Sequence, residues 1–260
     1  MTSTSLRRHK ATGLVVLLAG LVATGVGYAA VTGTAEAAPT KASAAVIDQG
    51  KQLYLEGCSS CHGLAAQGTS EGPGLIGVGA AAVDFQVSTG RMPLAQPAQQ
   101  APRKTPIYTE EQVAALAAFV ASLGPGPAIP TASDLDTSDA DLATGGVLFR
   151  TNCAQCHNFA GRGGALSDGK YAPSLMEATP REIWEAMATG PQNMPNFPNS
   201  TLDAKSKQEI IKYIDHLQTA TAPGGFELGS YGPVTEGVFI WTAGLGALLL
   251  AAVWIGAKVR

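Results

Sequence analysis

The sequence predicts an all-α chain in which two copies of one helical module lie between two apolar helices. Two observations support this fold class. The middle of the chain repeats its own landmarks at offsets of 94 to 102 residues, which indicates a duplicated module. Near each end, a run of 21 residues contains no charged side chain, from Ala11 to Val31 and from Gly237 to Ala257.

Each apolar run, as a helix about 31 Å long, is able to cross the hydrocarbon core of a bilayer. Neither run has a polar face, which disfavours the alternative of a buried core helix. Residues 1–37 are predicted to be either an uncleaved anchor or a signal peptide removed near Ala35-Glu36-Ala37-Ala38, and residues 237–257 a transmembrane helix. Basic residues at the outer end of each run place residues 38–234 on the extracytoplasmic side of the cell membrane and the C-terminus in the cytoplasm.

The part of the chain between the apolar runs is acidic. Residues 38–234 contain 18 Asp and Glu against 12 Lys and Arg. Such a surface has little to neutralise phosphates, so we expect no nucleic acid partner. A positively charged docking patch on another protein is the more natural partner.

All four cysteines belong to two copies of one motif, Cys58-Ser-Ser-Cys61-His62 and Cys153-Ala-Gln-Cys156-His157. Cys-x-x-Cys-His is the attachment signature of c-type haem. Two thiols one helical turn apart each form a thioether with a vinyl group on one porphyrin edge, and the next histidine binds the iron. A redox disulfide or half of a zinc site are the alternatives. Because the whole motif occurs twice with no spare cysteine, we predict two covalently bound haem c groups.

The second axial ligand of each iron is predicted to be a methionine, because few histidines lie outside the motifs and thioether sulfur suits haem iron. Met92 and Met194 stand at matched places in the repeat, and each precedes a proline. The predicted axial pairs are therefore His62 with Met92 and His157 with Met194. The other internal methionines, Met176 and Met187, are expected to fill the core.

Groups around the haems also have matched positions. Pro73 and Pro173 follow the two motifs, and the carbonyl of each is predicted to accept a hydrogen bond from the axial histidine. The alternative is that these prolines only stiffen a loop. Arg91 and Arg162 either neutralise haem propionates or are solvated surface charges.

The repeat and the loop signals divide the chain into two modules. We predict a first domain at 45–124, a linker at 125–139, a second domain at 140–222 and a second linker at 223–236. Each domain is expected to have an opening helix (47–56 in the first) and a closing helix (110–123 and 203–217), with Thr109 as an N-cap. Phe119 and Tyr213 are expected to pack across the opening helices. Residues 94–107 are predicted to be a surface loop, either uncommitted or in contact with a neighbouring subunit.

Together the Cys-x-x-Cys-His, Pro-x-Leu and Met-Pro landmarks resemble the class I cytochrome c domain, twice over, across residues 45–220. The terminal apolar segments and the Tyr231-Gly232-Pro233 approach resemble the dihaem cytochrome c subunits of the actinobacterial cytochrome bc1 (bcc) complex. That resemblance implies a respiratory quinol–cytochrome c reductase, a translocase containing cytochrome b and Rieske iron–sulfur subunits. It also implies that this chain is an electron carrier in membrane lipid that delivers electrons to a cytochrome aa3 oxidase.

Other functions use the same haem motifs. A dihaem peroxidase needs a vacant or displaceable axial ligand, and the matched Met-Pro pairs argue against one. The dihaem subunit of a cbb3-type oxidase and that of a membrane alcohol dehydrogenase are also electron carriers. The C-terminal apolar helix disfavours the oxidase subunit, which is typically anchored at its N-terminus.

Overall fold

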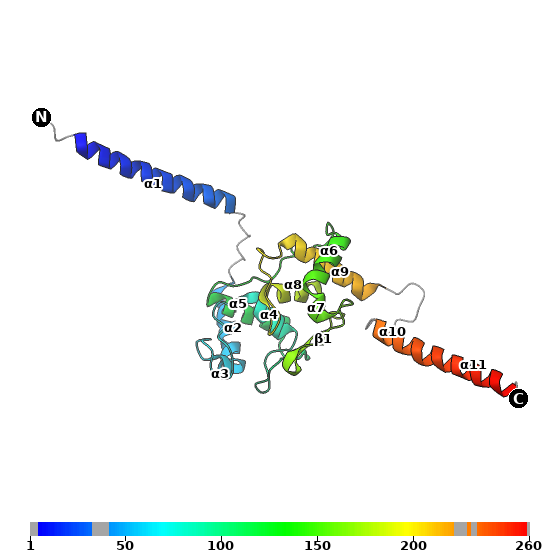
Figure 1. Cartoon of the computed structure of the whole chain (residues 1–260). Helices are drawn as coiled ribbons and strands as arrows, with labels where there is room; N and C mark the ends of the chain where they lie inside the picture. Colours follow the sequence, from blue (N-terminus) through cyan, green and yellow to red (C-terminus); the bar gives the residue numbers. More distant parts are fainter. Residues whose placement is uncertain (1–4, 33–41, 221–227, 230–232, 259–260) are drawn as a thin grey trace. The chain divides into compact units, whose positions relative to one another are not determined.

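The computed structural model describes residues 5–32, 42–220, 228–229 and 233–258, and most of these residues are helical (Figure 1). The predicted all-α fold class is confirmed. The second module also contains a short antiparallel hairpin with two residues in each strand, which the sequence pattern did not predict. The elements in chain order are α1 (Ser5–Thr32), α2 (Ala44–Gly57), α3 (Ser59–His62), α4 (Ala80–Ser88), α5 (Glu110–Ser122), α6 (Leu142–Asn152), α7 (Ala154–His157), β1 (Gly164–Ala165), η1 (Ser167–Gly169), β2 (Tyr171–Ala172), α8 (Pro180–Thr189), α9 (Ala204–Thr219), α10 (Pro233–Phe239), η2 (Ile240–Gly244) and α11 (Leu245–Lys258).

Helix α1 belongs to a compact unit of its own, residues 1–41. Its stretch Gly13–Val26 is apolar, and the side chains there are exposed. The possible cleavage site at Ala35–Ala38 lies outside the described residues.

The C-terminal apolar run forms a continuous helix from α10 through the π-helical turn η2 to α11. In the part of the chain that the structure describes, Val234–Lys258 is the one helix long and apolar enough to cross a membrane. Most of the predicted linker 223–236 lies outside the described residues, but 233–236 already belong to α10. Proline is favoured at the first position of a helix, and Glu236 complements the helix dipole there, so the helix begins earlier than hydropathy alone indicates.

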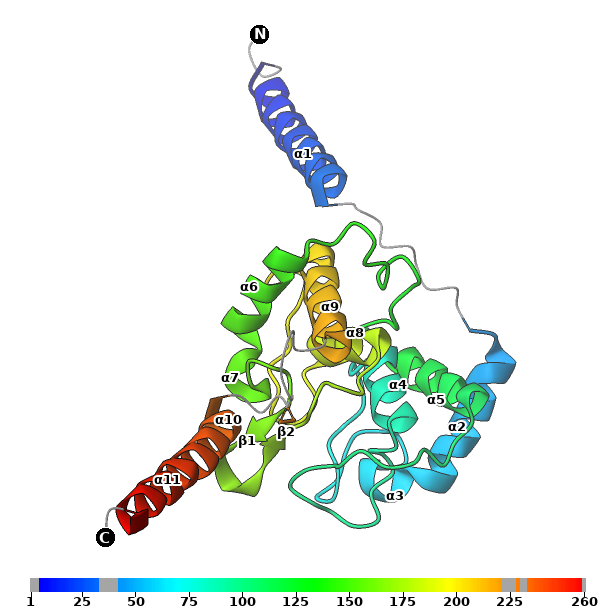
Figure 2. The same cartoon turned by 90° about the vertical axis from the view of Figure 1, so that its right-hand side faces the viewer.

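Each module is built on one helix crossing, α2 against α5 and α6 against α9 (Figure 2). The crossing point is a glycine in both copies. A Cβ at Gly50 would lie 1.9 Å from the Ala115 carbonyl oxygen, and one at Gly145 would lie 2.0 Å from the Glu209 carbonyl oxygen. Only a residue without a side chain allows the two backbones to approach this closely.

The Thr109 cap and the aromatic contacts follow the predictions, whereas α2 begins three residues before the predicted Ile47 and α9 ends two residues after the predicted Leu217. Thr109 caps α5 through a capping box with Gln112. The Tyr54 and Phe119 ring centroids lie 5.2 Å apart, and the Phe149 and Tyr213 centroids 5.3 Å apart. In both modules an aromatic side chain of the closing helix therefore packs on the opening helix.

Residues 125–139, predicted as a linker, are held against both modules. The Ala81 amide of α4 donates to the Pro127 carbonyl at 3.1 Å. At the other end, Lys212 of α9 donates to the carbonyls of Thr137 and Ala140 at 3.1 and 2.9 Å. These bonds fix the segment at both of its ends, unlike a free tether.

The two modules meet where α4 packs against α8, the matched short helices of the repeat. Arg181 of α8 forms an ion pair with Asp84 of α4 at 2.8 Å, and it also contacts Glu185 at 3.4 Å. The side chains of Asp84 and Glu185 are buried, so two carboxyl groups and one guanidinium lie in the interface.

The 94–107 segment contacts the second module of the same chain. Arg103 donates to both carboxylate oxygens of Glu182 at 2.6 and 3.0 Å. Neither expectation for this loop, an uncommitted surface or a contact with another subunit, included this partner. The bond joins residues 79 positions apart, which sequence spacing does not reveal.

Candidate haem sites

Each attachment motif forms a single helical turn at the end of the opening helix. Cys58 ends α2 and precedes α3, and Cys153 stands in the same way between α6 and α7. The His62 amide donates to the Cys58 carbonyl at 3.0 Å, and the His157 amide to the Cys153 carbonyl at 2.9 Å. This turn brings both thiols and the histidine of each motif together, as the spacing predicts.

The acidity of the thiols does not suit a redox disulfide. Burial, followed by the neighbouring cysteine, raises the pKa of Cys58 and of Cys153 to about 11. Disulfide oxidoreductases instead lower the pKa of the attacking thiol, because the thiolate is their nucleophile.

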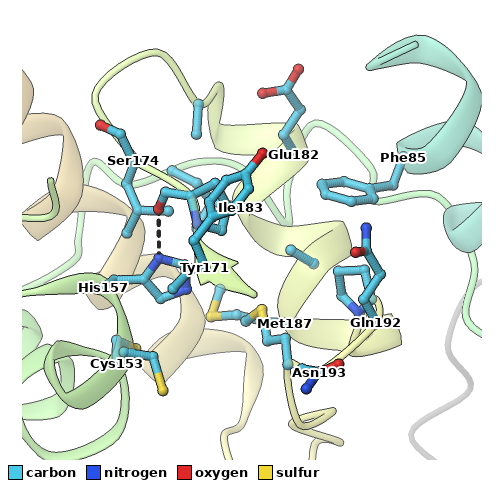
Figure 3. Close-up of a pocket in the computed structure, with 18 of the residues that line it drawn as sticks. Phe85, Cys153, His157, Tyr171, Ser174, Glu182, Ile183, Met187, Gln192 and Asn193 are labelled. Carbon is cyan, nitrogen blue, oxygen red and sulfur yellow. Dashed lines mark hydrogen bonds between the residues drawn. The ribbon is translucent and has the colours of Figure 1, made fainter. Parts of the chain in front are cut away.

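The histidines of both motifs contact the prolines that the repeat singled out. His62 Nδ1 lies 2.7 Å from the Pro73 carbonyl oxygen, and His157 Nδ1 lies 2.9 Å from the Pro173 carbonyl oxygen (dashed line in Figure 3). A carbonyl only accepts, so Nδ1 carries a proton, and a neutral imidazole held in this way has its lone pair on Nε2, where a metal binds. Burial lowers the pKa of His157, against the opposing effect of the Pro173 bond, and so favours the neutral, ligating form.

The methionines occupy distinct environments. Met92 is partly buried and packs against the core of the first module. Met194 is partly buried against the core of the second module and lines a cavity there. Met187 lines the same cavity but belongs to the buried core, with 2% of its surface exposed.

This cavity, of about 440 Å³, lies within the usual range for cofactor sites, about 300 to 1,000 Å³. It is lined by both attachment cysteines of the second module and by His157 and Met194. Figure 3 shows the His157 and Met187 side chains facing the same space. An imidazole and thioether sulfurs beside an attachment motif form a donor set that fits a c-type haem.

The first module supplies part of the wall of this cavity. Phe85 of α4 reaches toward it (Figure 3), and Arg91 and residues 100–103 also line it. Sequence reasoning assigned none of these residues to the second haem. The repeat identifies equivalent positions in the two modules, and it therefore predicts contacts within each module. It gives no information about residues of one module that line a cavity in the other.

Two buried guanidinium atoms have no hydrogen-bond partner among the described residues, Nη1 of Arg91 and Nε of Arg162. A buried unpaired donor is costly, and an anionic group of a bound ligand removes that cost. Both arginines were candidates for neutralising propionates, so the orphaned atoms fit a haem with its carboxylates.

Comparison with known proteins agrees with this assignment. The family model for cytochrome c matches residues 47–124, and the model for cytochrome c oxidase, cbb3-type, subunit III matches residues 140–214. A solved chain of the Kuenenia stuttgartiensis reducing HAO-like protein complex aligns with 65% of this chain at a TM-score of 0.39 and 17% identity, too low to bear on fold or function.

Full-length relatives are more informative. The cytochrome bc1 complex cytochrome c subunit of Mycobacterium tuberculosis is 47% identical over 263 residues, which cover 99% of this chain and 94% of the relative. The subunit of the same name from Corynebacterium efficiens is 46% identical over 267 residues, covering 96% of this chain and 90% of the relative. With both modules and the terminal segments matched at this identity, the chain belongs to the family of cytochrome c subunits of the cytochrome bc1 complex.

Proposed function

We propose that this chain binds two haem c groups covalently, one through Cys58 and Cys61 and one through Cys153 and Cys156. The observation that supports this most directly is the duplicated geometry of attachment turn, histidine and proline carbonyl. When bound, haem supplies a one-electron couple at its iron. The chain supplies attachment, orientation and burial.

His62 and Met92 are the proposed axial ligands in the first module, and His157 and Met194 those in the second. Pro73 and Pro173 hold the imidazoles with Nε2 free. With a histidine and a methionine on every iron, no axial position is left for a substrate. The chain is then an electron carrier within an oxidoreductase complex, and a peroxidase is disfavoured.

The proposed path runs from a Rieske iron–sulfur centre through the first and then the second module to a cytochrome aa3 oxidase. The relatives are named as subunits of a bc1 complex, which supports cytochrome b and iron–sulfur proteins as neighbours. The acidic balance of residues 38–234 suits docking to a basic surface. The order of the two haems follows the family resemblance.

The proposed topology places the haem modules on the extracytoplasmic side, with α11 ending in the cytoplasm. Lys258 at the end of this helix, followed by Arg260, supports this orientation through the positive-inside rule. Protease digestion of intact spheroplasts tests it. The modules should be cleaved from outside, and protection of both modules would refute the orientation.

Haem content and co-purification test the function. Pyridine haemochrome analysis should give two haems per chain, and the detergent-solubilised protein should co-purify with cytochrome b, a Rieske subunit and an aa3 oxidase. The family match of residues 140–214 keeps a cbb3-type oxidase subunit as the second candidate. Co-purification with a cbb3-type catalytic subunit or with an alcohol dehydrogenase would overturn the bc1 assignment. Cyanide binding to the resting protein would instead favour a peroxidase.

A further inference from the structure

The loop between Met92 and α5 is fastened across the second module by paired hydrogen bonds. Gln100 donates to the Tyr171 carbonyl at 2.6 Å and accepts from the Tyr171 amide at 3.0 Å. Gln192 does the same with the backbone of Ala101, at 3.2 and 3.1 Å. In both pairs, one side-chain amide group bonds to both the N–H and the C=O of a single backbone residue, as a neighbouring β-strand would. Each pair therefore holds the loop to the second module through two hydrogen bonds.

The Arg103–Glu182 ion pair completes this attachment. The Arg103 side chain is 44% exposed, so solvent screens this pair and its contribution to stability is small. Glu182 also caps α8, where its carboxylate accepts from the Thr179 amide. Glu182 thereby ties the first module's loop to the start of a helix that lines the second module's cavity.

Arg91, two residues before this loop, is 8% exposed and lines that cavity. Its guanidinium carbon lies 4.7 Å from the centre of the Phe85 ring, which supports one face of the group. Nη1 is buried without a hydrogen-bond partner in the described part of the chain. Burial, followed by the nearby Arg103, lowers the pKa of Arg91, but a guanidinium stays charged.

Glu182 acts on Arg91 through its charge but forms no ion pair with Arg91 among the described residues. Both oxygens of Glu182 are engaged by Arg103. A buried cation without a paired anion is unfavourable, so this position calls for an anion from a bound group. Arginine recognises carboxylates well because its planar fork donates two parallel hydrogen bonds.

We propose that Arg91 of the first module binds a propionate of the haem attached to the second module. This inference rests on the proposed function, since it requires haem at Cys153 and Cys156. Arg91 directly precedes Met92, the proposed ligand of the first haem. One dipeptide therefore contacts both haems, with its thioether in one module and its guanidinium in the other.

The test is a potentiometric titration of the full-length protein carrying Arg91→Gln. Loss of a positive charge beside a propionate disfavours reduction of the nearby iron. We expect the equilibrium constant for reduction of the second haem to fall about tenfold. For a one-electron couple, this lowers the reduction potential by about 59 mV. The component that disappears in a Cys153→Ala, Cys156→Ala variant identifies the second haem.

Matched variants separate this effect from a general change of charge. Arg150→Gln removes an exposed arginine of α6 that does not line the cavity, and it should leave both potentials near those of the wild type. Arg91→Lys keeps the charge and should shift the second potential less than Arg91→Gln does. A larger shift of the first haem, or equal shifts in Arg91→Gln and Arg150→Gln, would overturn the proposal.

Haem content separates this inference from the proposed function. Two haems per chain in Arg91→Gln, with an unchanged second potential, would refute the role of Arg91 and leave the dihaem assignment standing. If the Arg91→Gln protein does not assemble into its complex, an experimental structure of the wild-type complex with haem bound tests the proposal instead. The guanidinium should lie within about 3.2 Å of a propionate oxygen of the second haem. Contact with a first-haem propionate instead would overturn the inference.

Discussion

Met187 and Met194 both reach the cavity of the second module, and the chain holds them differently. Met187 lies within α8, and its side chain is part of the buried core. Met194 lies in the loop after α8, in a turn where its amide donates to the Pro191 carbonyl at 3.1 Å. A methionine in a loop can adjust its position to an iron atom more easily than a methionine held within a helix.

Met194→Ala is therefore expected to convert the second haem from low to high spin and to lower its potential, because the thioether is lost. Met187→Ala is the matched control. It should keep the low-spin spectrum but destabilise the module by about 2 to 5 kcal/mol through the cavity it creates. Visible and EPR spectra with thermal unfolding distinguish the two. A low-spin Met194→Ala protein beside a high-spin Met187→Ala protein would reverse the assignment.

Glu185 is a fully buried carboxyl group between the modules. Burial, followed by the charge of Asp84, raises its pKa to about 9, despite the opposing Arg181. The folded protein therefore keeps a proton on Glu185 that the unfolded chain releases near pH 4.5. Its contribution to stability is complete below the unfolded pKa, and it declines as the pH rises to about 9.

Glu185→Gln imitates the protonated form and should remove this part of the pH dependence. We expect the variant to gain on the order of 1 to 3 kcal/mol over the wild type at pH 8 and little at pH 5. Denaturant unfolding at both pH values measures the difference. An equal difference at the two pH values would show that Glu185 is ionised in the folded protein.

At the scale of the elements, the helix crossing is the feature that both modules share. Gly50 and Gly145 allow α2 and α6 to lie directly on the backbones of α5 and α9. The attachment turn follows directly at the end of each opening helix, at Cys58 and Cys153.

Gly145→Ala should force α6 away from α9, since the new Cβ would meet the Glu209 carbonyl oxygen at 2.0 Å. Overpacking of this kind costs about 1 to 3 kcal/mol or more. The control is Val147→Ala on the exposed side of α6, which should change stability by less than about 0.5 kcal/mol. Thermal unfolding of the second module in both variants tests this, and equal melting temperatures would contradict the role of the crossing.

At the scale of the whole molecule, the two modules share one cavity wall. The buried core cluster of each module consists of that module's own residues. The second module's cavity instead takes part of its wall from α4 and from the loop after Met92. Damage to the first module should therefore reach the second haem.

A Cys58→Ala, Cys61→Ala variant tests this dependence. We expect one haem per chain, an unfolded first module because ligation is coupled to folding, and a second haem more accessible to exogenous ligands such as imidazole. The reciprocal Cys153→Ala, Cys156→Ala variant should leave the spectrum of the first haem unchanged. Equal effects on the surviving haem in both variants would show that the dependence is symmetric.

Local features were predictable from the sequence because they depend on neighbours within a few residues of the chain. The attachment turns use contacts across three or four residues, and the Thr109 cap uses Gln112 three positions away. The His62–Pro73 bond spans 11 residues, yet duplication made it visible, since both copies keep the proline. The family followed from the same repeated landmarks.

What the tertiary structure alone decided is how the modules share one cavity. The Gln100–Tyr171 bonds join residues 71 positions apart, and Arg91 of the first module lines the cavity of the second module. The Asp84, Arg181 and Glu185 cluster exists only because α4 packs on α8. Such contacts depend on the relative orientation of two folded units, and no periodicity or spacing within either unit encodes that orientation.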